Sequence, residues 1–139
     1  MAGYSGTPLP KKLGLKPDHR ALFLNAPDSF GAELGELPPG VEIAEHARAG
    51  GERDVIVWFV RSERDLRGRF APLAQKLAAA GGLWIAWPKK ASGVPTDLDE
   101  NLVRAIGLAH GLVDNKVCAI DETWSGLRFV IRLKDRVKR

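Results

Sequence analysis

Two continuous apolar runs constrain the fold of this chain more than any other feature. They are DVIVWFV at 54–60 and GLWIAWP at 82–88. Each has the length of a strand and is rich in β-branched and aromatic residues, without the alternation of a strand that has one face in water. Such runs are typical of parallel strands covered by helices on both faces. The sequence therefore predicts an α/β protein with a mostly parallel sheet.

A helix is expected between these two strands. Ser62 is placed to cap it, and Gly81 and Gly82 are placed to stop it. Pro72 lies inside the segment and predicts a kink or two short helices. The expected apolar face has spacings of three and four residues and consists of Leu66, Phe70, Leu73, Leu77 and Ala80.

The C-terminal part repeats the strand and helix pattern and then changes it. Thr96 or Asp97 is placed to cap a second helix, which Gly111 closes. NKVCAIDE and GLRFVIRL follow as two strands separated only by TWS. Because a parallel crossover needs a longer connection, these strands are predicted to form an antiparallel hairpin. In the N-terminal half, the expected elements are a strand at 20–27, a short helix at 29–35, a strand at 40–46 and a loop at 47–53.

Composition and charge limit the classes of protein to which this chain can belong. Its 139 residues, 45% hydrophobic and 27% charged, predict one domain over 1–139, with an N-terminal extension at 1–19 and a basic tail at 134–139. No apolar stretch approaches the ~20 residues that would span a bilayer. The formal net charge of +4 equals that of residues 132–139, which hold five basic side chains and one acidic one. A solvated terminus is therefore expected rather than a nucleic-acid surface.

The N-terminus and the cysteine content bear on the compartment. No apolar segment of the secretory type opens the chain, and Cys118 is the single cysteine. These features predict a cytoplasmic protein without a disulfide. Cys118 lies in an apolar strand and is expected to be a small buried side chain rather than a nucleophile.

The order of the expected elements resembles the Rossmann-like sheet of the class I methyltransferases, which use S-adenosylmethionine. The resemblance is clearest from Asp54 onward, where AAAGGLWIAW at 78–87 looks like that family's glycine turn into a strand. It implies a single mixed sheet, mostly parallel, with a C-terminal antiparallel hairpin and helices on both faces.

The chain departs from that family after its first strand, where the methyltransferases place a glycine-rich turn that closes on the amino-acid part of the cofactor. The matching turn here is NAPDSFG at 25–31. Pro27 offers no N–H, and Asp28 would put a carboxylate near the cofactor carboxylate. We therefore expect S-adenosylmethionine to bind weakly or not at all, and no cofactor is predicted. Glu42 or Glu45 is placed to stand in for the family's ribose-binding acid.

A second resemblance spans both ends of the chain. YSGTPLPKKLG, WIAWPKKASGVPTDL and VCAIDETWSGLRFV are together similar to segments of a bacterial family of small domains of unknown function. That resemblance implies no activity, but it directs attention to these three segments.

The sequence lacks the usual signatures of a metal site, a serine hydrolase and a P-loop nucleotidase. His19, His46 and His110 have no metal-ligand spacing, so no metal site is predicted. No serine lies in a G-x-S-x-G context, and no P-loop motif occurs. No catalytic residue is therefore assigned.

The loops after the apolar strands should meet at one edge of the sheet and form a polar crevice with an aromatic wall. Arg61 and Ser62 begin the first of these loops. The candidate ligand-binding residues are Lys89, Lys90, Ser92, Asp121, Glu122, Thr123, Trp124 and Ser125. Of the two lysines, one should face the crevice near Trp124 while the other is solvated or paired. In the alternative interpretation, Asp121 and Glu122 only pair with the lysines, and Trp124 covers the core.

Two classes of function stay open. In the first, the chain is a degenerate methyltransferase-like domain that binds a small anionic ligand or a protein partner and catalyses nothing. In the second, it is a small-molecule enzyme, such as a methyltransferase with an altered cofactor loop. The missing glycine turn and the lack of a catalytic constellation favour the first.

Overall fold

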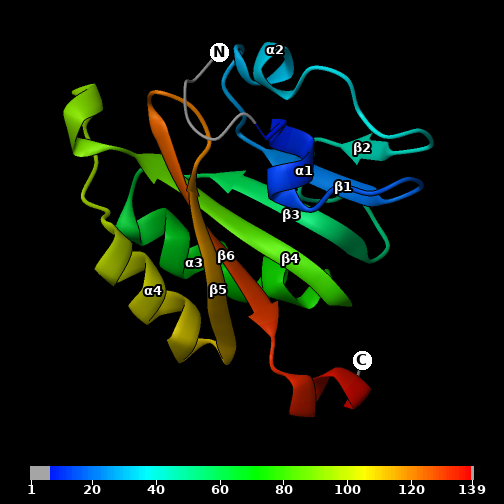
Figure 1. Ribbon diagram of the computed structural model, residues 1–139. Coiled ribbons are helices and arrows are strands. Elements are labelled where there is room, and N and C mark those ends of the chain that lie inside the picture. The colour runs from blue at the N-terminus through cyan, green and yellow to red at the C-terminus, as the bar shows by residue number, and fades with distance from the viewer. Residues whose placement is uncertain (1–6, 139) are drawn as a thin grey trace.

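The computed structural model describes residues 7–138, which form a six-stranded mixed sheet (Figure 1). The strand order is β2-β1-β3-β4-β6-β5; β6 runs antiparallel to both β4 and β5, and the other pairs are parallel. The strands are β1 (Arg20–Leu24), β2 (Glu42–Ala44), β3 (Arg53–Phe59), β4 (Leu77–Pro88), β5 (Leu112–Ala119) and β6 (Trp124–Ile131). The predicted fold class and the antiparallel C-terminal hairpin are confirmed.

Helices cover both faces of the sheet (Figure 1). One face carries α3 (Glu63–Gln75) and α4 (Glu100–Ala109), and the other carries α1 (Leu9–Leu13) and α2 (Phe30–Leu34). In β3, Ile56 and Trp58 belong to the core under α3 and α4. Val55 and Val57 alternate with them and belong to the core under α1 and α2. Burial on both faces is the reason why this strand is apolar throughout.

The boundary between α3 and β4 differs from the prediction. The helix ends at Gln75 and the strand begins at Leu77, so Leu77 and Ala80 do not lie on the helix face. The backbone N–H of Arg53 donates to the carbonyl oxygen of Lys76 at 2.7 Å, and Leu77 pairs with Arg53. Sheet pairing therefore overrides the helix propensity of this leucine and alanine segment.

Pro72 does not divide α3, which runs through it as one helix. Phe70 precedes the proline and Leu73 follows it, and both side chains are buried against the sheet. Packing on both sides of the proline therefore keeps the two parts in one element, although the proline removes a backbone donor.

The helix caps also differ from the prediction. The N-cap of α4 is Asp99, whose carboxylate accepts the backbone N–H of Leu102 at 2.8 Å. Asp97 lies before it and accepts the N–H of Glu63 at 2.7 Å, so it caps the start of α3 instead. Thr96 donates its hydroxyl to a backbone carbonyl at the end of β3. The segment before α4 thus ties the starts of two helices together.

The ends of the chain take part in the fold. Within the expected N-terminal extension, the carbonyl of Leu13 in α1 accepts the indole N–H of Trp84 in β4 at 3.0 Å, and both residues are fully buried. The expected basic tail contains the 3-10 helix η2 (Leu133–Lys138). In the described part of the chain, no helix is long and apolar enough to cross a membrane.

Candidate functional site

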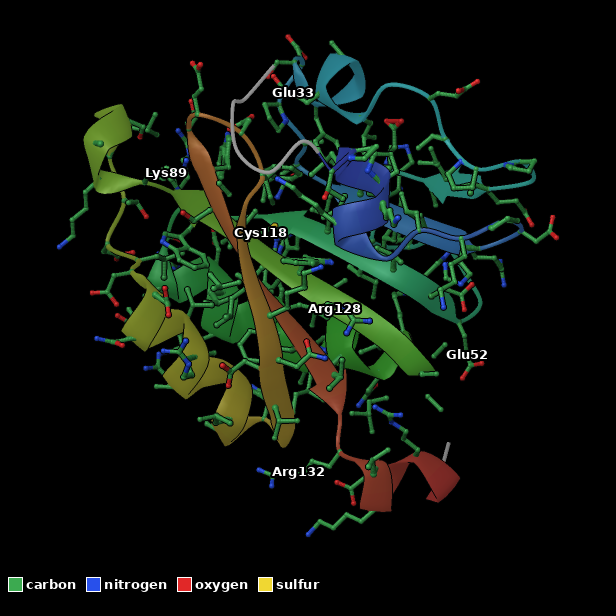
Figure 2. The ribbon with its side chains drawn as sticks, viewed as in Figure 1. Glu33, Glu52, Lys89, Cys118, Arg128 and Arg132 are labelled. Carbon is green, nitrogen blue, oxygen red and sulfur yellow. The ribbon has the colours of Figure 1, made fainter. Side chains whose placement is uncertain are left out.

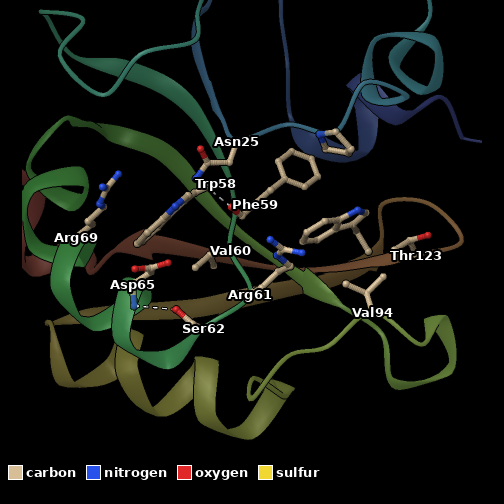
Figure 3. Close-up of a pocket in the computed structure, with 12 residues that line it drawn as sticks. Asn25, Trp58, Phe59, Val60, Arg61, Ser62, Asp65, Arg69, Val94 and Thr123 are labelled. Carbon is tan, nitrogen blue, oxygen red and sulfur yellow. Dashed lines mark hydrogen bonds between the residues drawn. The ribbon is translucent and has the colours of Figure 1, made fainter.

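A large cavity lies where the sheet changes its direction of growth. From β1 the chain goes to β2 on one side, and it then returns to β3 on the other side. In open α/β sheets, ligands bind outside the carboxyl ends of the strands at such a switch point. Here the ends of β1 and β3 border a cavity of about 700 Å³, which we call the switch-point pocket (Figure 3).

Charged and aromatic side chains line the switch-point pocket. Arg61 follows β3, and Asp65 and Arg69 come from the first two turns of α3. These three side chains are exposed, and no ion pair among them occurs within residues 7–138. Trp58 lies among the lining residues but is only 1% exposed, so it belongs to the floor. Trp124 is half-buried and forms part of the wall.

The start of α3 is already capped from within the protein. Ser62 has an extended backbone, and its hydroxyl oxygen accepts the N–H of Asp65 at 3.1 Å (Figure 3). The N–H of Glu63 donates to Asp97. Because these first-turn donors have acceptors, an anion in the pocket would depend on the side chains of Arg61 and Arg69 rather than on the helix N-terminus.

Asn25 joins the ends of β1 and β3. Its backbone has a φ of 58°, in the left-handed region that asparagine tolerates better than most residues. Its side-chain amide donates to the carbonyl of Phe59 at 3.4 Å (Figure 3). The turn that leaves β1 is thereby fixed at the border of the pocket.

This turn differs from the glycine-rich turn that the methyltransferases place after their first strand. No glycine occurs between Asn25 and Phe30. Pro27 lines the pocket but has no N–H, and the N–H of Phe30 donates back to the carbonyl of Pro27 at 2.9 Å. Asp28 adds an exposed carboxylate to the same turn. In this turn, Pro27 therefore offers no donor to a bound carboxylate, the N–H of Phe30 is engaged within the turn, and Asp28 adds a negative charge.

Of the eight predicted site residues, Thr123 and Trp124 line the switch-point pocket. The sequence predicted Trp124 in the hairpin turn, but it is the first residue of β6 and pairs with Pro88. Its ring meets that of Phe59 edge-on, with the ring centroids 5.1 Å apart. The sequence left open whether Trp124 covers the core or lines a pocket, and in the structure it does both. Ser125 follows it in the strand and is half-buried.

The other predicted residues build the hairpin rather than the pocket wall. Lys89 lies directly after β4 (Figure 2). Its ammonium group donates to the carbonyl of Asp121 at 2.8 Å, and its backbone N–H donates to the carbonyl of Thr123 at 2.8 Å. The carboxylate of Asp121, which is only 7% exposed, accepts the N–H groups of Thr123 and Trp124 at 2.7 and 2.8 Å. These bonds hold Trp124 in place. Glu122 is exposed.

Lys90 and Ser92 belong to the 3-10 helix η1 (Lys90–Ser92), which follows β4. Lys90 is exposed. The hydroxyl of Ser92 donates to the carbonyl of Lys89 at 2.6 Å and accepts the N–H of Val94 at 3.2 Å, so it fixes the loop. Neither lysine lines the switch-point pocket.

The sequence pointed to Arg61 and Ser62 as members of an edge loop, but it missed Asp65 and Arg69. A signal for the missed pair exists, because residues four apart on a helix share a face. Asp65 and Arg69 have that spacing and lie in the first turns after the strand that ends at the pocket.

Two further sequence expectations concern acidic and thiol groups. Glu42 lies in β2 and Glu45 just after it, and both are exposed; neither lines the switch-point pocket. Cys118 is half-buried, and burial raises the pKa of its thiol, an effect that nearby Lys12 and Lys116 oppose. In the part of the chain that the structure describes, no group of three or more His, Cys, Asp or Glu side chains is placed to hold a metal ion.

Two comparisons with known proteins find no relative of this chain. No protein-family model matches the chain, and no curated protein matches it. The resemblance to a bacterial family of small domains therefore stays a prediction.

Solved structures do match the fold. Fibrillarin from Aeropyrum pernix with natively bound S-adenosyl-L-methionine has a TM-score of 0.60 at 13% identity, over 93% of this chain and 71% of that one. A SAM-dependent methyltransferase from Aquifex aeolicus has a TM-score of 0.58 at 15% identity, over 88% and 87%. Magnesium protoporphyrin IX methyltransferase from Synechocystis PCC 6803 with bound SAH has a TM-score of 0.55 at 12% identity, over 89% and 78%. Likeness at this level of identity concerns architecture. This chain has the Rossmann-like fold of the class I SAM-dependent methyltransferases.

Proposed function

We propose that this domain binds a small anionic ligand in the switch-point pocket. The observation that supports the proposal is the pair Arg61 and Arg69, which line the pocket from the loop after β3 and from α3. Neither guanidinium forms an ion pair within the described residues, and Asp65 is the one carboxylate among the lining residues. Guanidinium groups match the geometry of carboxylates and phosphates and bind them with two parallel hydrogen bonds.

The proposal is limited to binding because the described residues that line the pocket include no nucleophile paired with a base. The Ser62 hydroxyl oxygen is occupied as a helix cap, and no histidine is among these lining residues.

A second candidate is a methyltransferase with an altered cofactor loop. It is favoured by the position of the pocket at the carboxyl ends of β1 and β3, in a fold whose similar structures include proteins that hold S-adenosylmethionine or S-adenosylhomocysteine. The turn at 25–31 argues against it, because Pro27 and Asp28 stand where that family has glycines, and Pro27 offers no N–H while Asp28 adds a negative charge.

Titration calorimetry at low ionic strength distinguishes the two candidates. Inorganic phosphate should bind the wild-type chain, and Arg61→Met or Arg69→Met should weaken this binding about tenfold, as expected for the loss of one charge-assisted hydrogen bond. Arg64→Met is the matched control, since Arg64 is exposed on the same helix and does not line the pocket.

S-adenosylmethionine and S-adenosylhomocysteine, each titrated alone, should give a heat of binding no larger than that of phosphate. Low-micromolar binding of either cofactor, unaffected by the two arginine substitutions, would favour the methyltransferase. A phosphate affinity that is the same in the wild type and in both variants would refute the anion site.

A further inference from the structure

A second cavity of about 320 Å³ adjoins the switch-point pocket, and we call it the side chamber. The two cavities share three lining residues, Asn25, Trp58 and Arg69. Arg69 is therefore the charged residue that borders both cavities.

The side chamber exists because the connection from β2 to β3 is short. Parallel strands are usually joined by a crossover of a dozen or more residues that includes a helix. Here residues 45–52 make the crossing without one. Three consecutive residues of this loop, Glu45, His46 and Ala47, line the chamber opposite Pro72 and Leu73 of α3. The space that a helix would fill is left open.

Hydrogen bonds from three cations hold the far half of this loop in place. The guanidinium groups of Arg20 and Arg53 donate to the carbonyl of Gly50 at 3.3 and 2.9 Å. The ammonium group of Lys76 donates to the carbonyl of Ala49 at 3.0 Å. Arg53 is only 5% exposed, so this anchor is part of the protein interior. The chamber is therefore preformed and does not depend on a mobile loop to shape it.

The chamber has an apolar floor and a polar rim. Leu24, Trp58 and Leu73 line it and are each less than 10% exposed, so their accessible atoms face the cavity from the core. Glu45 and His46 also line it and are exposed, and the half-buried Lys76 lines it with its ammonium group already donating to the carbonyl of Ala49. Such a floor favours an apolar group over a second charge, because burying apolar surface is favourable whereas burying an unpaired charge is costly.

We infer that the ligand is an amphipathic anion: a phosphate or carboxylate head bound by Arg61 and Arg69, joined to an apolar ring or chain that occupies the side chamber. The inference rests on the anion site proposed above and adds the class of molecule that carries the anion. The volume of the chamber equals that of about ten water molecules in the liquid, which is enough for a bicyclic ring.

The test uses 2-naphthyl phosphate together with its two halves, inorganic phosphate and 2-naphthol, in titration calorimetry. Ala47→Trp fills the chamber from its exposed rim, and Ala105→Trp, on the exposed side of α4, is the matched control. Naphthyl phosphate should bind the wild type at least about tenfold more tightly than phosphate does. Ala47→Trp should remove this advantage and leave the phosphate affinity unchanged, while Ala105→Trp should change neither. Arg69→Met should weaken both anions.

Different outcomes overturn different claims. If Ala47→Trp does not change the affinity for naphthyl phosphate, or if the ring adds nothing to phosphate binding in the wild type, the side-chamber inference is wrong while the anion site stands. If naphthol and naphthyl phosphate bind equally and neither responds to Arg69→Met, the anion site is wrong as well. Circular dichroism and urea unfolding of each variant confirm that the comparison is made on folded protein.

Discussion

Two charged regions meet at the same edge of the sheet and use their charges in opposite ways. In the hairpin region, Lys89 and Asp121 direct their polar atoms at backbone groups of the β5–β6 connection. In the pocket region, Arg61 and Arg69 border a cavity and form no ion pair within the described residues. Both regions looked alike as patterns of residues that follow apolar strands.

The difference shows that position at the carboxyl edge does not by itself make a charged residue a ligand contact. A lysine whose ammonium group already donates to a carbonyl stabilises the fold, and moving it to a ligand would break that bond. An exposed arginine that forms no ion pair in the described chain can bind an anion without breaking an interaction that stabilises the fold. We therefore expect substitutions in the hairpin region to change stability, and substitutions in the pocket region to change binding.

The largest stability effect is expected for Asp121→Ala. It removes the acceptor of two backbone N–H groups from a buried position, and we expect the free energy of unfolding to fall by about 2 kcal/mol. Asp121→Asn keeps one acceptor oxygen and should lose less than half of this. Urea unfolding measures both variants, and a loss below about 0.5 kcal/mol for the alanine variant would contradict the structural role of Asp121.

A smaller effect is expected for Lys89→Met, with Lys90→Met as its neighbouring control. Loss of the bond from the Lys89 ammonium group to the Asp121 carbonyl should cost about 1 kcal/mol, whereas the exposed Lys90 should cost close to nothing. Thermal unfolding of the two variants gives the comparison. Equal melting temperatures would mean that the hairpin does not depend on Lys89, and a loss of phosphate binding in either variant would return the lysines to the ligand site.

The smallest stability effect is expected in the pocket region. Arg61→Met and Arg69→Met replace exposed side chains that have no ion-pair partner in the described chain, so the free energy of unfolding should stay within about 0.5 kcal/mol of the wild type. The same variants should bind phosphate about tenfold more weakly, as described above. If either variant unfolds at clearly lower urea concentration, its arginine is a structural residue, and the contrast between the two regions fails.

The core strands could be predicted from sequence because burial on both faces leaves a local mark. DVIVWFV is apolar throughout since its two faces pack against different sets of helices, and this constraint acts on each residue of the run separately. The antiparallel hairpin could be predicted for a similar reason, because a short connection permits only one direction of pairing.

The start of β4 could not be predicted in this way. Leu77 and the alanines after it favour a helix locally, and only the hydrogen bond between Arg53 and Lys76, across 23 positions of sequence, brings this segment into the sheet. The caps of α3 and α4 show the same limit, since the choice between Asp97 and Asp99 depends on which helix end lies within reach of each carboxylate.

The sequence by itself determined the α/β class, the parallel central strands and the edge of the sheet at which polar loops gather, because each follows from hydrophobic burial or connection length, which act locally. Only the tertiary structure decided which charged residues at that edge are available. Lys89 is bound to a backbone carbonyl 32 positions away, and Asp121 to backbone N–H groups two and three positions away. Asp65 and Arg69 reach the pocket only because α3 packs beside β3. Whether a polar group is already satisfied depends on atoms brought together by folding, and no local pattern records them.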